Sequence, residues 1–298
     1  MRPVAGETNH GRGRARPARR RVLGALLALA VPALALTAAS PASAASAFRQ
    51  EFAPFQYCPV ETAQWCVVAT PLGGEFKLDL KTTKIEHPVT LQGGIGSQSF
   101  GDQPLIAPIG VEPLSKTPQE VPGGLTGLSE SIGGPVTATA ELAGQIVLNK
   151  GNLLAQEGVA VTLPIKVKLD NEILGSNCYI GSDAEPIVLH LTTGTTSPSP
   201  PNQPISGSRG TLEGGGKGKI VKITGNSLVD NNFAVPGANG CGENPLIDLV
   251  VDAGIGLPAP AGLNTAIMNG ELEETAAVWA AKYKPKVKKP KKEKKPKA

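Results

Sequence analysis

A strictly alternating run in the middle of the chain constrains the fold more than any other feature. The run is VTLPIKVKLD and begins at Val161. Successive side chains of a β-strand point to opposite faces of the sheet, so this period predicts a half-buried antiparallel strand. The side chains expected on the buried face are Val161, Leu163, Ile165, Val167 and Leu169, and those expected on the other face are Thr162, Pro164, Lys166 and Lys168.

Similar short β-prone segments follow one another from Trp65 onward, separated by glycine, proline, asparagine and aspartate. The 36 glycines and 27 prolines interrupt the chain too often for a helical bundle. We therefore predict an all-β fold, an antiparallel β-sandwich-like architecture with Gly/Pro-rich loops. Six of the eleven aromatic residues lie between Phe48 and Phe76. We expect them to pack at one end of the sandwich; a sugar-binding or partner-binding surface is the alternative.

Three segments of the body leave alternatives open. Residues 96–124 are rich in proline and glycine and could divide the body into two sub-regions. Residues 192–207 have the composition of a linker between domains. Residues 271–283 fit a short C-terminal helix, because acidic residues open the segment and Lys282 lies near its end. The Asn269-Gly270 pair instead favours a strand hairpin at the same place.

Four cysteines, Cys58, Cys66, Cys178 and Cys241, predict two disulfides in an oxidising compartment. Three connectivities are compatible with four cysteines. We favour Cys58–Cys66 with Cys178–Cys241, because the first two are close and the residues between them suit a turn. The pairing would make residues 192–207 a long loop within one domain rather than a linker. There is no CxxC motif and the body has two histidines, so a zinc site is not favoured.

Residues 1–44 have the layout of a secretory signal peptide. Seven arginines come first, an apolar run follows, and Ala42-Ser43-Ala44 fits the small-residue cleavage pattern. We predict cleavage after Ala44, or after Ala45, and a secreted body over residues 45–283. A retained membrane anchor is the competing interpretation, which Pro32 within the apolar run disfavours. The triplet Arg19–Arg21 leaves twin-arginine export open beside the general secretory route.

Charge is divided between an acidic body and a cationic end. Residues 45–281 hold 12 basic and 23 acidic side chains, a net charge of −11, whereas residues 282–298 hold ten lysines and one glutamate, a net charge of +9. Residues 284–298 also contain three prolines and almost no apolar side chain, which predicts a disordered, extended tail. The lysines of this tail are Lys284, Lys286, Lys288, Lys289, Lys291, Lys292, Lys294, Lys295 and Lys297.

A tail of this kind binds polyanions through its charge density. We expect it to bind anionic cell-wall polymers or other acidic surfaces and so to hold the secreted body at the cell envelope. Two alternatives stay open. The tail could only add solubility, or fold back onto the acidic body. It could also bind nucleic acid, although no aromatic residue follows Tyr283 to stack on bases.

The sequence contains no recognisable catalytic or cofactor motif, so we expect a protein that is not an enzyme and that needs no cofactor or metal. The rival interpretation is a secreted hydrolase that uses carboxylates of the body. Its candidate acid pairs are Asp183 with Glu185 and Asp248 with Asp252. His190 is a candidate general base within a strand, but a structural or surface role is favoured.

Two further stretches resemble binding motifs without matching them. Residues 228–232, LVDNN, offer side-chain oxygens to calcium but lack the spacing of a calcium loop. Residues 210–219, GTLEGGGKGK, lack the glycine spacing of a phosphate-binding loop. We expect this glycine-rich stretch to be a hairpin turn.

The motifs LGSNCYIGS, LTTGTT and FAVPGANGCG resemble those of a family of uncharacterised secreted proteins common in actinobacteria. The likeness extends from about Cys58 to Gly270. The family has no known activity, so it implies no catalytic residue. It places Cys178 and Cys241 within matching motifs, which agrees with their pairing. The Lys/Pro tail lies outside this resemblance and is similar only in composition to the tails of some surface adhesins.

Overall fold

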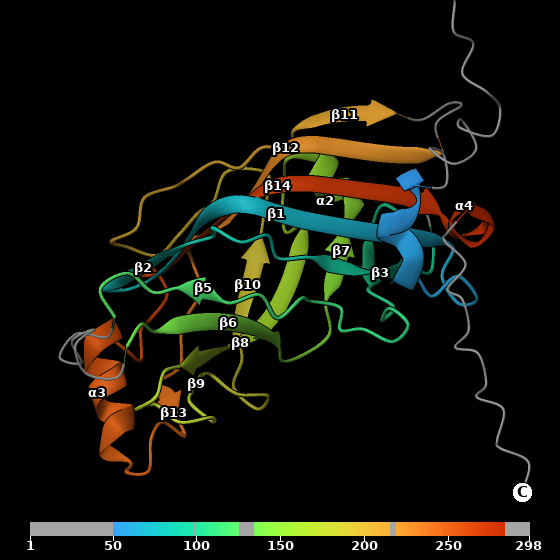
Figure 1. The fold of residues 1–298 in the computed structure, drawn as a ribbon. Helices are drawn as coiled ribbons and strands as arrows, with labels where there is room; N and C mark the ends of the chain where they lie inside the picture. The colour runs from blue at the N-terminus through green and yellow to red at the C-terminus, as the bar shows by residue number, and fades with distance from the viewer. Residues whose placement is uncertain (1–49, 98, 125–133, 215–218, 284–298) are drawn as a thin grey trace, which may run out of the picture. The chain divides into compact units, whose positions relative to one another are not determined.

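The computed structural model describes residues 50–97, 99–124, 134–214 and 219–283. Within these residues, antiparallel strands form one six-stranded and one eight-stranded sheet, which face each other (Figure 1). The predicted all-β, sandwich-like fold is thereby confirmed. Both favoured disulfides, Cys58–Cys66 and Cys178–Cys241, are also present. The signal segment 1–44 and the tail 284–298 lie outside the described residues.

The first sheet, here the β1 sheet, is built on two long strands from opposite ends of the chain. β1 and β14 pair from Trp65 opposite Ala276 to Lys77 opposite Thr265. β12 and then β11 extend the sheet beyond β14, while β2 and β3 pair with the two halves of β1. The strands are β1 (Trp65–Leu78), β2 (Lys81–Lys84), β3 (Leu91–Ile95), β11 (Thr211–Gly214), β12 (Ile220–Asp230) and β14 (Thr265–Ala276).

The second sheet, here the β8 sheet, has the alternating run of the sequence as its central strand. β6 and β7 pair with one side of β8, and β9 and β10 pair with the other. The five side chains predicted for the buried face are buried, and Pro164 on the opposite face is buried as well. The strands are β4 (Asp102–Pro104), β5 (Gln119–Glu120), β6 (Thr137–Leu142), β7 (Val147–Asn149), β8 (Val161–Asp170), β9 (Tyr179–Ile180), β10 (Ile187–Leu191) and β13 (Ala238–Asn239).

The two sheets are connected at both edges. At one edge Thr192, just after β10, and Val229 of β12 exchange backbone hydrogen bonds of 2.9 and 2.8 Å. At the other edge the side chain of Gln119 in β5 accepts hydrogen bonds from the backbone N–H groups of Glu86 and His87, at 2.9 and 3.0 Å. Figure 1 shows β8 and β10 running steeply across the direction of β1 and β14. The inward faces of the crossed sheets therefore enclose a shared interior.

The segments that looked like linkers take part in this body. Residues 96–124 contain β4 and β5, which pair with β7 and β6. Residues 192–207 begin at the junction between β10 and β12 and form a loop of the body, as the Cys178–Cys241 link requires. β11 and β12 form the hairpin predicted for the glycine-rich stretch, with Gly214 opposite Val221, and its tip, residues 215–218, lies outside the described residues.

The structure of residues 271–283 decides between a helix and a strand hairpin, the two interpretations of this segment. β14 passes through Asn269 and Gly270 without turning and ends at Ala276, so the hairpin interpretation is wrong. Both neighbouring strands shift register at this point, between Pro71 and Gly73 on β1 and between Thr224 and Asn226 on β12. A Cβ atom on Gly270 would lie 2.2 Å from the carbonyl oxygen of Thr70, so glycine permits close strand contact here rather than a turn.

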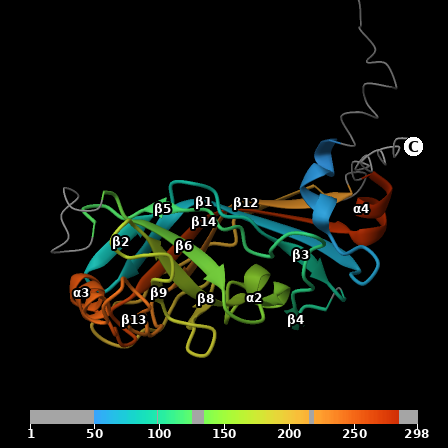
Figure 2. The same ribbon diagram turned by 60° about the horizontal axis from the view of Figure 1, so that its bottom comes forward.

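The helices are short; α3 lies at one end of the body, α4 and η1 lie at the other, and α2 lies between them beside β8 (Figure 2). They are η1 (Ala53–Tyr57), α2 (Lys150–Ala155), α3 (Leu246–Ile255) and α4 (Ala277–Tyr283). α4 is the predicted C-terminal helix, although it includes only the second half of the expected segment. Among the described residues, no helix is long and apolar enough to span a bilayer.

Of the six N-terminal aromatic residues, Phe52 and Phe55 pack at one end of the β1 sheet as predicted, whereas Phe76 stacks on Phe233 and lines the cavity, and Phe48 lies outside the described residues. Phe52 and Phe55 are fully buried beside the Cys58–Cys66 disulfide and α4. The ring centroids of Phe52 and Tyr283 are 5.1 Å apart. We call this group the aromatic cluster; its buried members are Phe52, Phe55, Cys58, Ala63, Cys66, Val68, Ala277 and Ala280, with Trp279 and Tyr283 packed against them.

Candidate functional site

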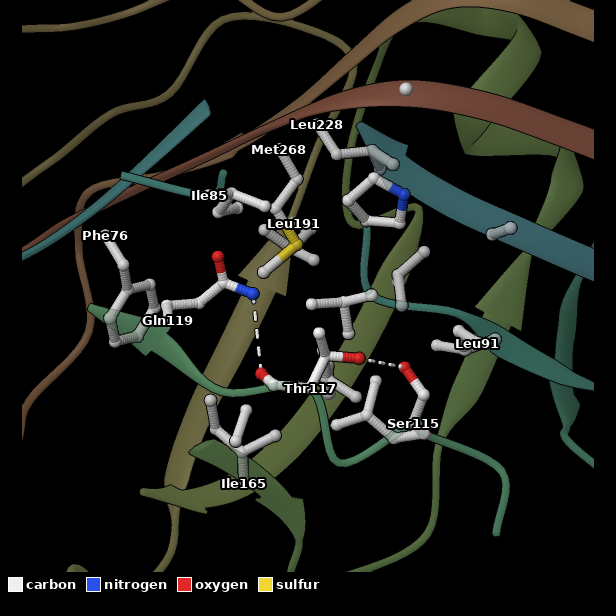
Figure 3. A pocket seen from close by; sticks show the side chains of 18 of the residues that line it. Phe76, Ile85, Leu91, Ser115, Thr117, Gln119, Ile165, Leu191, Leu228 and Met268 are labelled. Carbon is white, nitrogen blue, oxygen red and sulfur yellow. Dashed lines mark hydrogen bonds between the residues drawn. The ribbon is translucent and has the colours of Figure 1, made fainter. Parts of the chain in front are cut away.

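An apolar cavity of about 200 Å³ lies between the inward faces of the two sheets (Figure 3). Protein interiors are close-packed and hold few voids larger than a water molecule. This cavity exceeds the roughly 150 Å³ of an engineered apolar cavity that stays dry and binds benzene. It is therefore large enough to hold an apolar guest.

The cavity is lined along the length of strands in both sheets. All five inward side chains of β8, from Val161 to Leu169, contribute to its wall. A strand rises about 3.3 Å per residue, so this part of the wall is about 26 Å long. Across the cavity, the inward face of β1 contributes residues from Val67 to Leu78. The lining along β8 offers an apolar chain contacts over this length.

Small residues at inward positions leave the space unfilled. Ala69 of β1 and Ala138 and Ala140 of β6 line the cavity, where larger side chains would reduce its volume. Phe76 is the one aromatic residue in the wall among the described residues. The remainder is mostly aliphatic, and Figure 3 shows Leu91, Ile165, Leu191, Leu228 and Met268 pointing into the space from strands of both sheets.

One ion pair forms part of the cavity wall. Lys150, the first residue of α2, places its Nζ 2.7 Å from Oε1 of Glu274 on β14, and their side chains are 18% and 14% exposed. The same Nζ lies 5.4 Å from the ring centre of Trp65. The start of α2 is fixed by Asn149, whose side chain accepts a hydrogen bond from the N–H of Asn152 at 2.9 Å. Lys150 and Glu274 thus neutralise each other, and the wall also includes Lys81, Lys84 and Glu271.

The uncharged polar side chains of the wall fall into two groups. Those near β5 are bonded to one another and to the backbone: Gln119 donates to the carbonyl oxygens of His87 and Thr117, and Ser115 and Thr117 share a hydrogen bond of 3.0 Å (Figure 3). Asn226 of β12 differs. The residue is only 5% exposed, no hydrogen bond joins its side chain to another described residue, and its amide atoms are reached from the cavity.

The carboxylates considered for a hydrolase do not reach the cavity. Asp183 bonds Lys166 at 2.8 Å, and this hydrogen bond raises the pKa of Lys166 above its usual value. Asp248 and Asp252 accept hydrogen bonds of 2.7 Å from the backbone N–H groups of Cys241 and Ala238. Asp248 and Asp252 therefore hold the backbone near the Cys178–Cys241 link, while Asp183 and Glu185 are exposed. No metal-ligand group of three or more His, Cys, Asp or Glu side chains occurs within the described ranges.

His190 and the LVDNN stretch also have structural roles. The His190 side chain is exposed on β10, and its backbone N–H donates to Oδ2 of Asp230 at 2.7 Å. The other carboxylate oxygen of Asp230 accepts from the N–H of Asn232, whose own side-chain oxygen accepts from the N–H of Ser199. The side-chain oxygens of Asp230 and Asn232 are thus occupied by backbone donors, whereas the buried Oδ1 of Asn231 has no hydrogen-bond partner among the described residues.

Sequence reasoning placed the four cysteines correctly and missed the cavity. The nine tail lysines, Lys284 to Lys297, lie outside the described residues. A weak signal for the cavity exists in the strand TATAEL, where alanine occupies both of its central inward positions. That signal gains meaning only when the facing strands are known to carry small residues as well.

Comparisons of the chain with protein-family models, curated proteins and solved structures gave no match. The likeness to secreted actinobacterial proteins remains a prediction from short motifs. The functional interpretation therefore depends on the geometry of the cavity and on the chemistry of its wall.

Proposed function

We propose that the protein is a secreted, non-enzymatic carrier that binds an extended apolar chain, such as a fatty acyl or polyprenyl chain, between its sheets. The observation that supports this most strongly is the aliphatic cavity that follows β8 from Val161 to Leu169. Each methylene group removed from water contributes about 0.8 kcal/mol. Ten such groups contribute on the order of 8 kcal/mol before the cost of ordering the ligand, which is enough for useful affinity.

A carrier fits the wall chemistry better than a hydrolase. Glu274 and Glu271 are the two acids that line the cavity among the described residues. Glu274 is paired with Lys150, and the carboxylate of Glu271 lies 2.7 Å from Nζ of Lys222. A general acid and a nucleophilic or basic carboxylate must both face the substrate. Two carboxylates held by separate lysines supply no such pair.

We further propose that the Lys/Pro-rich tail holds the carrier at anionic polymers of the cell envelope. The support is the charge division of the sequence, −11 for the body and +9 for the end. A concentrated cationic segment is attracted to polyanions and is released by salt. The two disulfides fit the oxidising compartment that this location requires.

The carrier proposal is tested with cis-parinaric acid, an apolar chain whose fluorescence rises when it leaves water. Ala140→Phe should fill the cavity and weaken binding at least tenfold. Val188→Phe, on the outer face of β10, is the matched control and should bind as the unchanged protein does. Equal binding by both variants, or no binding by the unchanged protein, would show that the cavity is not a ligand site.

The tether proposal is tested by retention on purified cell wall across a salt series. The mature chain, residues 45–298, is compared with a chain that stops at Tyr283. Retention of the longer chain alone, with release by salt, is expected. Equal retention of both chains would contradict the proposal and direct attention to the body.

A further inference from the structure

Asn226 is the unusual residue of the cavity wall. Its side chain has the same inward direction along β12 as Leu228, and its cross-strand neighbour on β14 is Gly270, which is followed on β1 by Pro71. Neither neighbour has a side chain that can form a hydrogen bond. The Asn226 amide thus faces an apolar space with one acceptor oxygen and two N–H donors available.

Such an amide disfavours folding of the empty protein. A polar group that faces an apolar space without a partner is unfavourable, whereas a leucine of nearly the same shape would suit the position. The other buried amide in the wall, Gln119, bonds to the backbone through both its oxygen and its nitrogen. Asn226 is therefore not explained by the stability of the sheet.

We propose that Asn226 recognises an uncharged polar group, such as a hydroxyl, on the apolar chain bound in the cavity. This inference depends on the proposed carrier function and narrows its ligand. Asn226 can donate to such a group and accept from it. A charged group would not suit this position, because the cross-strand neighbours Gly270 and Pro71 offer it no opposite charge. The expected ligand is thus a chain with a hydroxyl along its length.

The test compares stearic acid with a series of stearic acids that carry one hydroxyl at different carbons. The unchanged protein should bind the best hydroxylated isomer about 3- to 10-fold more tightly than stearic acid, the discrimination of one hydrogen bond. Asn226→Leu should remove that preference and leave the affinity for stearic acid unchanged or higher. The ligand-free Asn226→Leu protein should melt about 2–4 °C higher, because an unpaired amide has been removed.

Two further variants keep the result interpretable. Asn226→Ala removes the amide without adding bulk and should lose the preference in the same way. Met268→Leu changes the wall beside Leu228 without changing its polarity, and it should keep the preference. If stearic acid binds and no isomer is preferred, the role of Asn226 is refuted while the carrier function stands. If Asn226→Leu lowers the melting temperature, the amide serves the fold. If neither class of acid binds, both proposals fail.

Discussion

The aromatic cluster and the cavity lie on opposite faces of the same strand. Val68 of β1 packs into the aromatic cluster, while Val67 beside it lines the cavity. On the outer face, Phe52 and Phe55 are fully buried against small residues of α4. On the inner face, alanines meet aliphatic side chains and a space is left between them. The outer face of β1 is thus tightly packed, whereas its inner face borders a cavity. The cavity therefore results from the small inward residues and not from loose packing of the whole protein.

Truncating one side chain on each face should reveal this contrast most clearly. Phe55→Ala should lower the free energy of unfolding by about 3–5 kcal/mol, because Phe55 is 1% exposed and its removal creates a new void. Leu228→Ala should cost about 2 kcal/mol or less, because Leu228 is half-buried and already borders empty space. Urea denaturation of both variants measures the difference. Equal losses would mean that the inner face is as tightly packed as the outer.

The Cys58–Cys66 disulfide belongs to the aromatic cluster and the Cys178–Cys241 disulfide to the core between the sheets. The two disulfides should contribute differently to the free energy of unfolding. Replacing Cys178 and Cys241 by alanine should cost about 4 kcal/mol, since the link closes a sequence separation of 63 residues. Replacing Cys58 and Cys66 should cost about 2.5 kcal/mol for a separation of 8 residues. Denaturation under non-reducing conditions gives both values. A larger loss for the short link would show that the aromatic cluster needs this link for its packing as well as for the entropy of the unfolded chain.

Enlarging a small residue on each face gives an effect of opposite sign. Ala280→Leu should destabilise the protein by about 1–3 kcal/mol, because Ala280 is completely buried in the aromatic cluster. Ala140→Leu should be neutral or stabilising by up to about 1 kcal/mol, because the added atoms enter the cavity. Thermal melts of the two variants suffice for the comparison. Destabilisation by both would indicate that the cavity walls cannot accept extra volume.

The smallest expected effect on stability comes from the ion pairs of Lys222 with Glu271 and Glu273. Hydrogen bonding to Glu271, supported by Glu273, raises the pKa of Lys222 above its ordinary value. A lysine whose pKa is raised by folding stabilises the protein below the unfolded value, about 10.5, and this contribution disappears as the pH rises through the folded value. Lys222→Met should therefore reduce stability near neutral pH by under about 1 kcal/mol and flatten the decline above pH 10.5.

The matched variant for this charge is Lys116→Met, since Lys116 is exposed and lies 3.5 Å from Glu141. Its stability curve should follow that of the unchanged protein across the same pH range. If the stability of the Lys222→Met variant and that of the unchanged protein fall equally above pH 10.5, the ion pairs of Lys222 do not contribute to folding.

Local patterns determined how much of the fold was predictable. The alternation from Val161 to Leu169 identified β8 and its buried face, because a period of two has one structural meaning when it persists. Spacing within the chain identified both disulfides. Asn269-Gly270 misled, because the same dipeptide that favours a tight turn also suits a place where two neighbouring strands shift register. Which of these occurs depends on pairing with β1 and β12, far away in the sequence.

The cavity could not be predicted, because no single strand contains it. Ala140, Ala69 and Gly270 come from three strands that only the sheet topology brings to one space. The role of Asn226 could not be predicted from the sequence either, because an asparagine in a strand is usually hydrogen-bonded to another part of the fold. Its lack of a partner among the described residues is a property of its surroundings, not of its sequence neighbours.

The central position of β14 sets the order of events when the chain is made. β14 lies between β1 and β12, and Trp65 pairs with Ala276, about 200 residues later. A ribosome that adds 5–20 residues per second needs about 10–40 s to supply the missing strand. Until then β1 has no partner on that side, and the cavity has only part of its wall. The cavity is therefore complete only when synthesis is nearly finished.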